Sequence, residues 1–315
     1  MAGMPSHSTP VAAIDLGTNT ALMLLARLDS SGRLLVMEDL CETTRLGAGL
    51  ARSGGLCEAG MRRALEALLR FAALLDEHGV DGASCRVVAT AVLRRANNSE
   101  PFIAQVARET GFQVEVISEA DEARLGHQAV VGEGFGAETL IVDVGGGSTE
   151  LAGRAGALRF SVPVGAVVLT ELYLGLDGAP PVESGGFSAL WDRAERELSS
   201  FPSGLARKAP EVVCLGGTAT NLACLDLRLA TFDPKRAEGH RFPRSAAREW
   251  ALRLHNLPLK QRRLLPIEAD RAEILPAGLA CVAAALTQLQ AQTARVSGKG
   301  IRYGVARELL LKSAP

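Results

Sequence analysis

The segment Asp15-Leu-Gly-Thr-Asn-Thr20 joins two apolar stretches, residues 11–16 and 21–28. The same pattern is repeated in Asp143-Val-Gly-Gly-Gly-Ser-Thr149, again between two apolar stretches. In each copy the pattern predicts a strand that reaches an aspartate, passes through glycine and hydroxyl residues, and returns as a second strand. A duplication on this scale predicts two domains of one α/β design rather than a solenoid of short repeats.

Alternating strands and helices are expected in the rest of both halves and indicate an α/β layer architecture. Apolar residues at helical spacing predict a helix at residues 57–77, and Gly111 is expected to end a second helix at residues 101–110. The remaining elements expected are strands at 34–40, 85–89, 114–117, 139–144, 150–154, 158–162 and 211–215, a helix at 184–198, a mostly helical segment to residue 292, and a last helix at 303–311.

A chain of 315 residues is long enough for two ordinary domains. We expect lobe one to span residues 10–125 and lobe two residues 126–302, with a hinge near residues 118–130. The C-terminal helix, residues 303–313, is placed so that it can return and complete lobe one.

The composition indicates a globular protein, with 47% hydrophobic and 22% charged residues. A net charge of −1 provides no global field toward nucleic acid or anionic lipid. The N-terminal residues carry no secretory signal pattern, and the longest apolar stretch, residues 274–286, is too short to span a bilayer. The six cysteines form no C-x-x-C pair, which is typical of reduced thiols without zinc. We therefore expect a cytoplasmic protein with no nucleic-acid or membrane partner.

One stretch departs from this neutral balance. Residues 228–263 contain ten Lys or Arg against Asp233, Glu238 and Glu249. Such a run is either a solvated helical face or a surface that receives a polyanion, and its sequence leaves both interpretations open.

The two glycine-hydroxyl segments have the chemistry of phosphate-binding loops. Glycine lets backbone N–H groups converge on an oxygen atom, and Ser and Thr hydroxyls add donors. Asp15 and Asp143 stand at strand ends, where each could hold a hydrated divalent cation. Either loop alone could be a hairpin turn, but two copies in matching context favour phosphate. The candidate phosphate-binding residues of these loops are Gly17, Thr18, Asn19, Thr20, Gly145, Gly146, Gly147, Ser148 and Thr149.

A third turn, Gly216-Gly217-Thr218, leads from a strand into an apparent helix. The N–H groups of a helix N-terminus could receive another phosphate, and a tight structural connection is an equal alternative. A Walker-type loop does not fit any of the three turns, because no G-K-[ST] follows.

Five motifs, taken together and in order, make the resemblance specific. The two loops and the third turn occur with Thr90-Ala-Val-Leu-Arg-Arg-Ala96 and Ile117-Ser-Glu-Ala-Asp-Glu-Ala-Arg-Leu125. The chain thereby resembles the exopolyphosphatase / guanosine pentaphosphate phosphohydrolase family. The resemblance implies two ribonuclease-H-like lobes of the actin, sugar-kinase and heat-shock ATPase superfamily, with an active-site cleft between them. It also implies a divalent cation, usually Mg²⁺, release of terminal phosphate from polyphosphate or guanosine pentaphosphate, and a homodimer.

The resemblance also assigns roles to single residues. Glu122 falls on the residue that activates the attacking water, and Arg94 on an arginine that contacts the phosphate chain. Asp143 and Glu150 fall on carboxylates that position metal and water. Such a set suits phosphoryl transfer, which needs an in-line water, a base and cations on the equatorial oxygens. Two neighbours have simpler interpretations: Arg124 could pair with Glu122 or Asp121, and Arg95 could be a solvated surface charge.

Several positions depart from the family pattern. The family writes D-x-G-S-N-S where this chain has Thr18 and Thr20, so the hydroxyls are kept. In Gly300-Ile-Arg-Tyr-Gly304 the arginine of the family's G-L-R-E-G is kept as Arg302, but Tyr303 replaces the acid. Arg271 lies in a segment that resembles the family's R-A-D-x, and we expect Arg271 and Arg302 to contact phosphate. The sequence also stops where longer members add an HD-type helical domain, which favours short polyphosphate.

Two other functions are compatible with the loops. The first is an ATP-dependent kinase of the same superfamily, but the Arg94 and Glu122 segments favour the phosphatase. The second is a non-catalytic sensor of polyphosphate or guanosine tetraphosphate, against which the intact Glu122, Asp143 and Glu150 argue. The motifs do not separate polyphosphate from guanosine pentaphosphate, because both substrates share the terminal phosphoanhydride.

Overall fold

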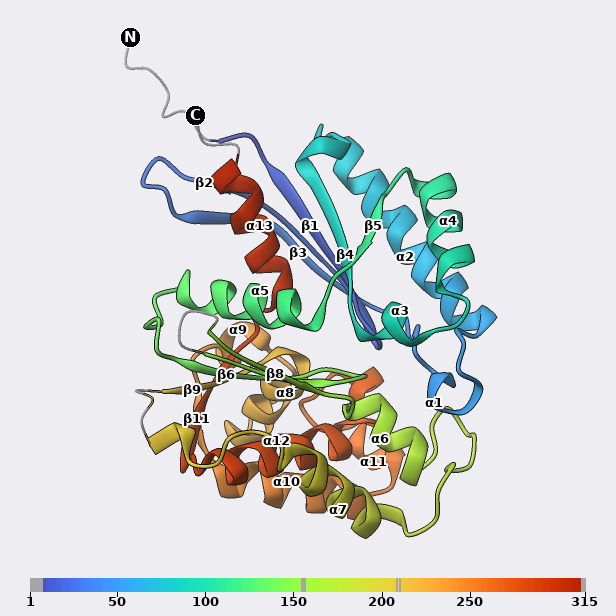
Figure 1. Ribbon diagram of the computed structural model, residues 1–315, viewed down its shortest axis with the longest axis vertical. Helices are drawn as coiled ribbons and strands as arrows, with labels where there is room; N and C mark the ends of the chain where they lie inside the picture. Colours follow the sequence, from blue (N-terminus) through green and yellow to red (C-terminus); the bar gives the residue numbers. More distant parts are fainter. Residues whose placement is uncertain (1–7, 154–156, 208, 210, 313–315) are drawn as a thin grey trace.

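The computed structural model describes residues 8–153, 157–207, 209 and 211–312. Figure 1 shows two sheets, one in each half of the molecule, with helices packed around them. This arrangement confirms the predicted α/β fold with two lobes. Within the described ranges, no helix is long and apolar enough to cross a membrane.

The sheet of lobe one has the strand order β3-β2-β1-β4-β5. Strands β1 to β3 form an antiparallel meander, and β4 and β5 run parallel to β1. The strands are β1 (Val11–Leu16), β2 (Thr20–Leu28), β3 (Leu34–Thr43), β4 (Cys85–Ala89) and β5 (Val114–Val116), as the sequence predicts to within a few residues.

Helices cover one face of this sheet on the right of the upper lobe in Figure 1. Helix α2 buries Leu68 and Phe71 against the strands, and α4 ends at Gly111, whose φ of 76° suits glycine. The helices are α1 (Leu50–Ser53), α2 (Glu58–Glu77), α3 (Ala91–Arg95) and α4 (Ser99–Thr110), with a short 3₁₀ turn at Gly82–Ser84.

The sheet of lobe two repeats the topology of the first. Its order is β10-β11-β9-β6-β7-β8, in which β8-β7-β6-β9-β11 matches the five strands of lobe one and β10 is added at the edge. The strands are β6 (Leu140–Val144), β7 (Thr149–Gly153), β8 (Leu158–Val162), β9 (Val212–Leu215), β10 (Arg241–Pro243) and β11 (Thr293–Ser297). Residue 154, the expected end of the second strand in this meander, lies outside the described residues.

Two of these strands correct the sequence-based prediction. The segment up to residue 292 is mostly helical as expected, but β10 interrupts it, and β11 follows it without having been predicted. Both strands are short, and β11 pairs with β9 and β10, which lie far from it in sequence. Their extended conformation therefore depends on tertiary pairing rather than on a local apolar pattern.

Lobe two contains most of the helices. Helix α12 is apolar on all sides and is buried among α6, α7, α8 and α10. The helices are α6 (Ala166–Tyr173), α7 (Gly186–Leu198), α8 (Gly216–Asp226), α9 (Pro234–Ala237), α10 (Arg244–Asn256), α11 (Leu259–Arg262) and α12 (Leu275–Leu289), with 3₁₀ turns at Leu205–Arg207 and Ala269–Arg271.

Helix α5 (Glu119–Val131) lies where the lobes meet, and α13 (Ile301–Lys312) lies above it in lobe one, both on the left in Figure 1. Helix α13 packs on β1, β2 and α5, so close that a Cβ on Gly304 would lie 2.2 Å from the Leu125 carbonyl oxygen. Helix α5 buries Leu125 against lobe one and Ala123 against lobe two. The predicted division between residues 125 and 126 stays a prediction, since a single helix packs on both sheets. Residue 313, the predicted end of the last helix, is outside the described ranges.

Candidate functional site

The turn between β1 and β2 is closed by a hydrogen bond from the Gly17 N–H to the Thr20 carbonyl oxygen, at 2.9 Å. The Asn19 carbonyl accepts from the N–H groups of Thr44 and Arg45, which fixes the turn against the chain that follows β3. Within the described part of the chain, Asp15 Oδ1 and Asn19 Nδ2 are buried and have no hydrogen-bond partner. Because such atoms are costly to leave unpaired, this turn has an acceptor and a donor available for a ligand.

The turn between β6 and β7 repeats this geometry, with Gly145 N–H donating to the Ser148 carbonyl at 3.0 Å. Asp143 on β6 lies directly opposite Glu150 on β7. In lobe one the matching partner of Asp15 is Leu22. The second loop therefore carries a facing carboxylate pair where the first carries one carboxylate. Glu150 is 4% exposed and accepts a hydrogen bond from the Ser161 hydroxyl at 3.1 Å.

The third turn begins α8 directly after β9. Gly216 has a φ of 77°, and a Cβ there would lie 3.4 Å from Asp143 Oδ1. The Arg271 guanidinium lies over Gly217, where a Cβ would come within 2.1 Å of Arg271 Cζ. The structure thus places the third turn and Arg271 beside the second loop, and phosphate binding there stays a prediction.

Glu122 reaches the cleft from the first turn of α5. The Ser118 hydroxyl caps this helix by accepting from Asp121 N–H at 3.1 Å, and the positive N-terminus of the helix favours the nearby acids. Glu122 is 8% exposed, and its Oε2 lies 2.8 Å from Arg94 Nη2. Arg94 also donates to the Ile117 carbonyl at 2.8 Å, so the arginine is held on two sides and orients the carboxylate.

The pKa values of the four carboxylates at this site are all raised, mainly because the groups are buried, and for Asp15, Glu122 and Glu150 neighbouring carboxylates add to the shift. Burial raises the pKa of Asp15 to about 7, with a further contribution from Asp143 that Arg302 opposes. Burial likewise raises the pKa of Asp143 to about 6, against the effect of Arg271.

The pKa values of the two glutamates, Glu122 and Glu150, are also raised. Burial raises the pKa of Glu122 to about 7, against Arg94 and with support from Asp15 and Asp143. Burial, followed by the charges of Glu122 and Asp143, raises the pKa of Glu150 well above its ordinary value. The four side chains therefore form one electrostatic cluster contributed by both lobes and by α5.

A divalent cation suits this cluster, because it would relieve the repulsion and satisfy Asp15 Oδ1. Among the described residues, no three His, Cys, Asp or Glu side chains converge closely enough to ligate one ion by themselves. Mg²⁺ does not need such a cage, since it is usually held by one or two carboxylates together with water and substrate phosphate. The donor set therefore fits Mg²⁺ and does not fit zinc.

Several predicted phosphate ligands also have protein partners for their side chains, among them Arg271, whose Nε donates to Glu268 Oε2. The Thr149 hydroxyl donates to the Val164 carbonyl at 2.7 Å, and the Thr218 hydroxyl to the Val144 carbonyl at 3.2 Å. Arg302 binds both oxygens of Asp39 on β3, at 2.8 and 3.0 Å, and the Tyr303 hydroxyl donates to the same carboxylate at 2.9 Å. A phosphate contact by Arg302 would have to share or replace Asp39.

The contacts of Arg124 and Arg95 test the simpler interpretations of these two residues. Arg124 pairs with Asp121 at 3.2 Å, which confirms one of the simpler interpretations, and it also binds Glu308. Arg95 is exposed but donates to the Gly147 carbonyl at 3.3 Å, so the interpretation as a purely solvated charge is wrong. This contact joins lobe one to the second loop, so the sequence around Arg95 could not have predicted it.

The basic stretch 228–263 has several internal partners. Arg262 donates to the carbonyls of Leu257 and His255, and Arg241 pairs with Glu211. Arg253 lies 4.6 Å from the centre of the Trp250 ring. These contacts favour a structural role for those side chains, and a polyanion surface here stays a prediction.

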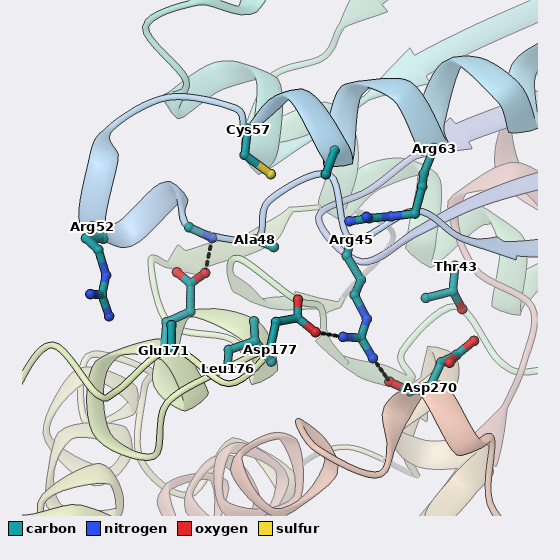
Figure 2. Close-up of a pocket in the computed structure, with 13 residues that line it drawn as sticks. Thr43, Arg45, Ala48, Arg52, Cys57, Arg63, Glu171, Leu176, Asp177 and Asp270 are labelled. Carbon is teal, nitrogen blue, oxygen red and sulfur yellow. Dashed lines mark hydrogen bonds and ion pairs between the residues drawn. The ribbon is translucent and has the colours of Figure 1, made fainter.

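A cavity of about 720 Å³ lies beside the first loop and is lined by residues of both lobes (Figure 2). Arg45 pairs across it with Asp177 and donates to the Asp270 carbonyl at 3.4 Å. Glu171 of lobe two accepts from the backbone N–H groups of Gly49 and Ala51, the latter at 3.2 Å. Among the described residues that line this cavity, none belongs to the carboxylate cluster. Its contacts connect the lobes at the α1 side of the cleft, away from α5.

Comparison with known proteins identifies the family of the chain. A family model described as the Ppx/GppA phosphatase family matches residues 26–313. The chain belongs to the Ppx/GppA phosphatase family. Phosphatase activity is the activity class of this family, and the predicted resemblance is confirmed.

Solved structures of other members share the architecture. A Ppx/GppA protein of Aquifex aeolicus is 29% identical, with 98% of this chain and 100% of that chain covered at a TM-score of 0.78. A second structure of an Aquifex aeolicus PPX-GPPA enzyme is 30% identical over 95% and 99% of the two chains, with a TM-score of 0.75. An exopolyphosphatase from Cytophaga hutchinsonii, 21% identical over 96% and 98%, has the same fold at a TM-score of 0.82.

Proposed function

We propose that this Ppx/GppA phosphatase hydrolyses the terminal phosphoanhydride bond of inorganic polyphosphate, preferentially of short chains, or of guanosine pentaphosphate. One observation carries the proposal. Glu122 is 8% exposed, is oriented by Arg94, and shares an electrostatic environment with Asp15 of lobe one and Asp143 of lobe two. A water molecule held at this point has a base beside it and a phosphate loop on either side. That is the arrangement that in-line attack requires.

The chain's own residues supply three functions in this proposal. The carboxylate of Glu122, whose pKa is raised to about 7, accepts a proton from the attacking water near neutral pH. The N–H groups of the two glycine loops and the unpartnered Asn19 Nδ2 bind phosphate oxygens. Arg94 and Arg271 place positive charge near the transferring group, where negative charge is spread over the equatorial oxygens.

Asp15, Asp143 and Glu150 are the residues that would hold Mg²⁺, singly or in pairs. When bound, the ion would neutralise phosphate charge. Asp143 and Glu150, opposite each other on β6 and β7, would also orient water.

The proposal is tested by a side-by-side assay of phosphate release from short polyphosphate, long polyphosphate and guanosine pentaphosphate. Release without any acceptor supports hydrolysis, and a higher rate on one substrate identifies the preference. Strict dependence on ATP and a second substrate would instead support the kinase alternative. Tight binding of polyphosphate or guanosine tetraphosphate without any turnover would support the sensor.

The proposal includes a cytoplasmic homodimer whose only ligands are the metal ion and the phosphate substrate. Sedimentation of the purified protein tests the dimer. A mass of one chain, 33.1 kDa, over the whole concentration range would contradict it.

A further inference from the structure

The side chain of Thr18 is enclosed by three glycines from two lobes. It is 5% exposed. A Cβ on Gly47 would lie 2.3 Å from Thr18 Cγ2, and a Cβ on Gly146 would lie 2.9 Å from Thr18 Cβ. A Cβ on Gly147 would lie 2.7 Å from Thr18 Oγ1. No side chain larger than hydrogen fits at these positions without a shift, and Thr18 supplies the nearest atom at each of them.

The contact crosses the cleft. Thr18 belongs to the first loop, and Gly146 and Gly147 belong to the second. The backbone of Thr18 is held from its own lobe, because Gly47 N–H donates to the Thr18 carbonyl at 2.8 Å. A β-branched side chain on a fixed backbone has few rotamers, so the Thr18 side chain, with its hydroxyl toward Gly147 and its methyl group toward Gly47 and Gly146, is a rigid spacer. Arg95 reinforces the same contact by donating to the Gly147 carbonyl at 3.3 Å.

The methyl group is what distinguishes this threonine from a serine. A phosphate-binding hydroxyl is present in both residues, but only threonine has the Cγ2 atom that packs toward Gly47 and Gly146. In the neighbouring residue, by contrast, Asn19 Nδ2 has no partner within the described residues and is available to a ligand. The two side chains therefore have different surroundings although they are adjacent in one loop.

We propose that Thr18 is a positioning residue, whose side-chain shape sets the separation of the two phosphate loops in the closed cleft, rather than a phosphate ligand. The effect that we expect on turnover rests on the proposed hydrolysis, whereas the effect that we expect on closure of the two lobes does not. In that reaction the base and the loops that hold the phosphate belong to different parts of the molecule. A change in loop separation therefore misplaces the base, the water and the phosphorus atom relative to one another. Substrate binding depends on the backbone nests of each loop and should change less than turnover.

A pair of nearly isosteric substitutions separates shape from hydrogen bonding. Thr18→Val keeps the shape and removes the hydroxyl, and Thr18→Ser keeps the hydroxyl and removes the methyl group. We expect Thr18→Val to retain kcat within about twofold, and Thr18→Ser to lower kcat about tenfold with KM changed by less than about threefold. Thr231→Ser and Thr231→Val, at an exposed position in lobe two, are the matched controls. A loss of kcat of tenfold or more in Thr18→Val, or a Thr18→Ser enzyme equal to wild type, would overturn the proposal.

Closure can be measured without activity. Gly49 and Ala51 donate their N–H groups to Glu171 of the other lobe, so amide exchange at these two residues reports whether the lobes are closed. Gly147→Ala should accelerate this exchange, since its Cβ would meet Thr18 Oγ1, and the added Thr18→Ala substitution should restore slow exchange. Unchanged exchange in Gly147→Ala, or no restoration in the double variant, would contradict the proposal. This result stands even if wild-type protein releases no phosphate from any tested substrate, which would refute only the hydrolysis.

Discussion

Asp143 and Glu150 illustrate how far single residues could be predicted. The family resemblance assigned both carboxylates to metal and water, and the hairpin register places them opposite each other, while their roles stay predictions. The hydroxyls of Thr149 and Thr218 were predicted as phosphate donors, yet they bind the carbonyls of Val164 and Val144. Those carbonyls lie on other segments of the fold, and local sequence does not show which hydroxyl will be consumed by such a partner.

Removing Arg94 should shift the acidic limb of the pH–rate profile. Burial raises the pKa of Glu122 and Arg94 lowers it, so loss of the guanidinium raises that pKa above about 7. The base is then protonated over a wider range, and kcat/KM should begin to fall at a higher pH as the solution is acidified. We expect this shift in Arg94→Met, measured on polyphosphate between pH 5 and 9, in addition to a lower maximal rate. A limb that stays in place would show that Arg94 does not control the protonation of Glu122.

At the scale of elements, α5 shows why the predicted hinge region, residues 118–130, was not recognised as a helix. Its buried residues lie on two sides, Leu125 and Ala129 toward lobe one and Ala123 and Val130 toward lobe two. A helix between two sheets does not present one apolar stripe, so the periodicity that identified α2 is weak here. The strand β11 escaped prediction for a related reason, since its partners β9 and β10 are distant in sequence.

Protonation of His127 should destabilise α5 and the lobe contact it mediates. His127 is 4% exposed, its Nε2 lies 3.2 Å from the Ala137 carbonyl, and burial lowers its pKa. The folded state therefore keeps the neutral imidazole at pH values where the unfolded chain is protonated. Stability contributed in this way is present above the unfolded pKa of about 6.5 and is lost as the pH falls below it.

Urea unfolding at pH 7 and pH 5 measures this effect. We expect the loss of unfolding free energy between the two pH values to be smaller in His127→Gln than in wild type. The exposed His78 provides the control, and His78→Gln should keep the wild-type difference. An equal pH dependence in His127→Gln and wild type would show that the imidazole is not the group that titrates.

At the scale of the whole molecule, the sequence predicted two lobes and their common meander, because both depend on motifs that are repeated along the chain. It did not predict how the lobes touch. Thr18 against Gly147, Arg95 on the Gly147 carbonyl, and Glu171 on Gly49 and Ala51 are all contacts between distant segments. The same limit explains Arg302, whose partner Asp39 lies on β3.

The Arg302–Asp39 pair should stabilise the return of α13 to lobe one. Removing one member of a buried pair leaves the other without a partner, and the Asp39 side chain is 31% exposed, which reduces the cost below that of a fully buried pair. We expect Asp39→Ala to lower the free energy of unfolding by about 2 kcal/mol. Asp192→Ala, at an exposed position on α7, should change it by less than about 0.5 kcal/mol. Equal stabilities of the two variants would mean that the pair contributes nothing.

The identity of the base is the centre of the account, and turnover of Glu122→Gln tests it most directly. Glu119→Gln, at an exposed position in the same first turn of α5, is the matched control. We predict that Glu122→Gln lowers phosphate release from short polyphosphate by about a hundredfold or more, while calorimetric affinity for that substrate and the activity of Glu119→Gln stay near wild type. Wild-type turnover in Glu122→Gln would contradict the assignment of the base, and with it the proposed mechanism.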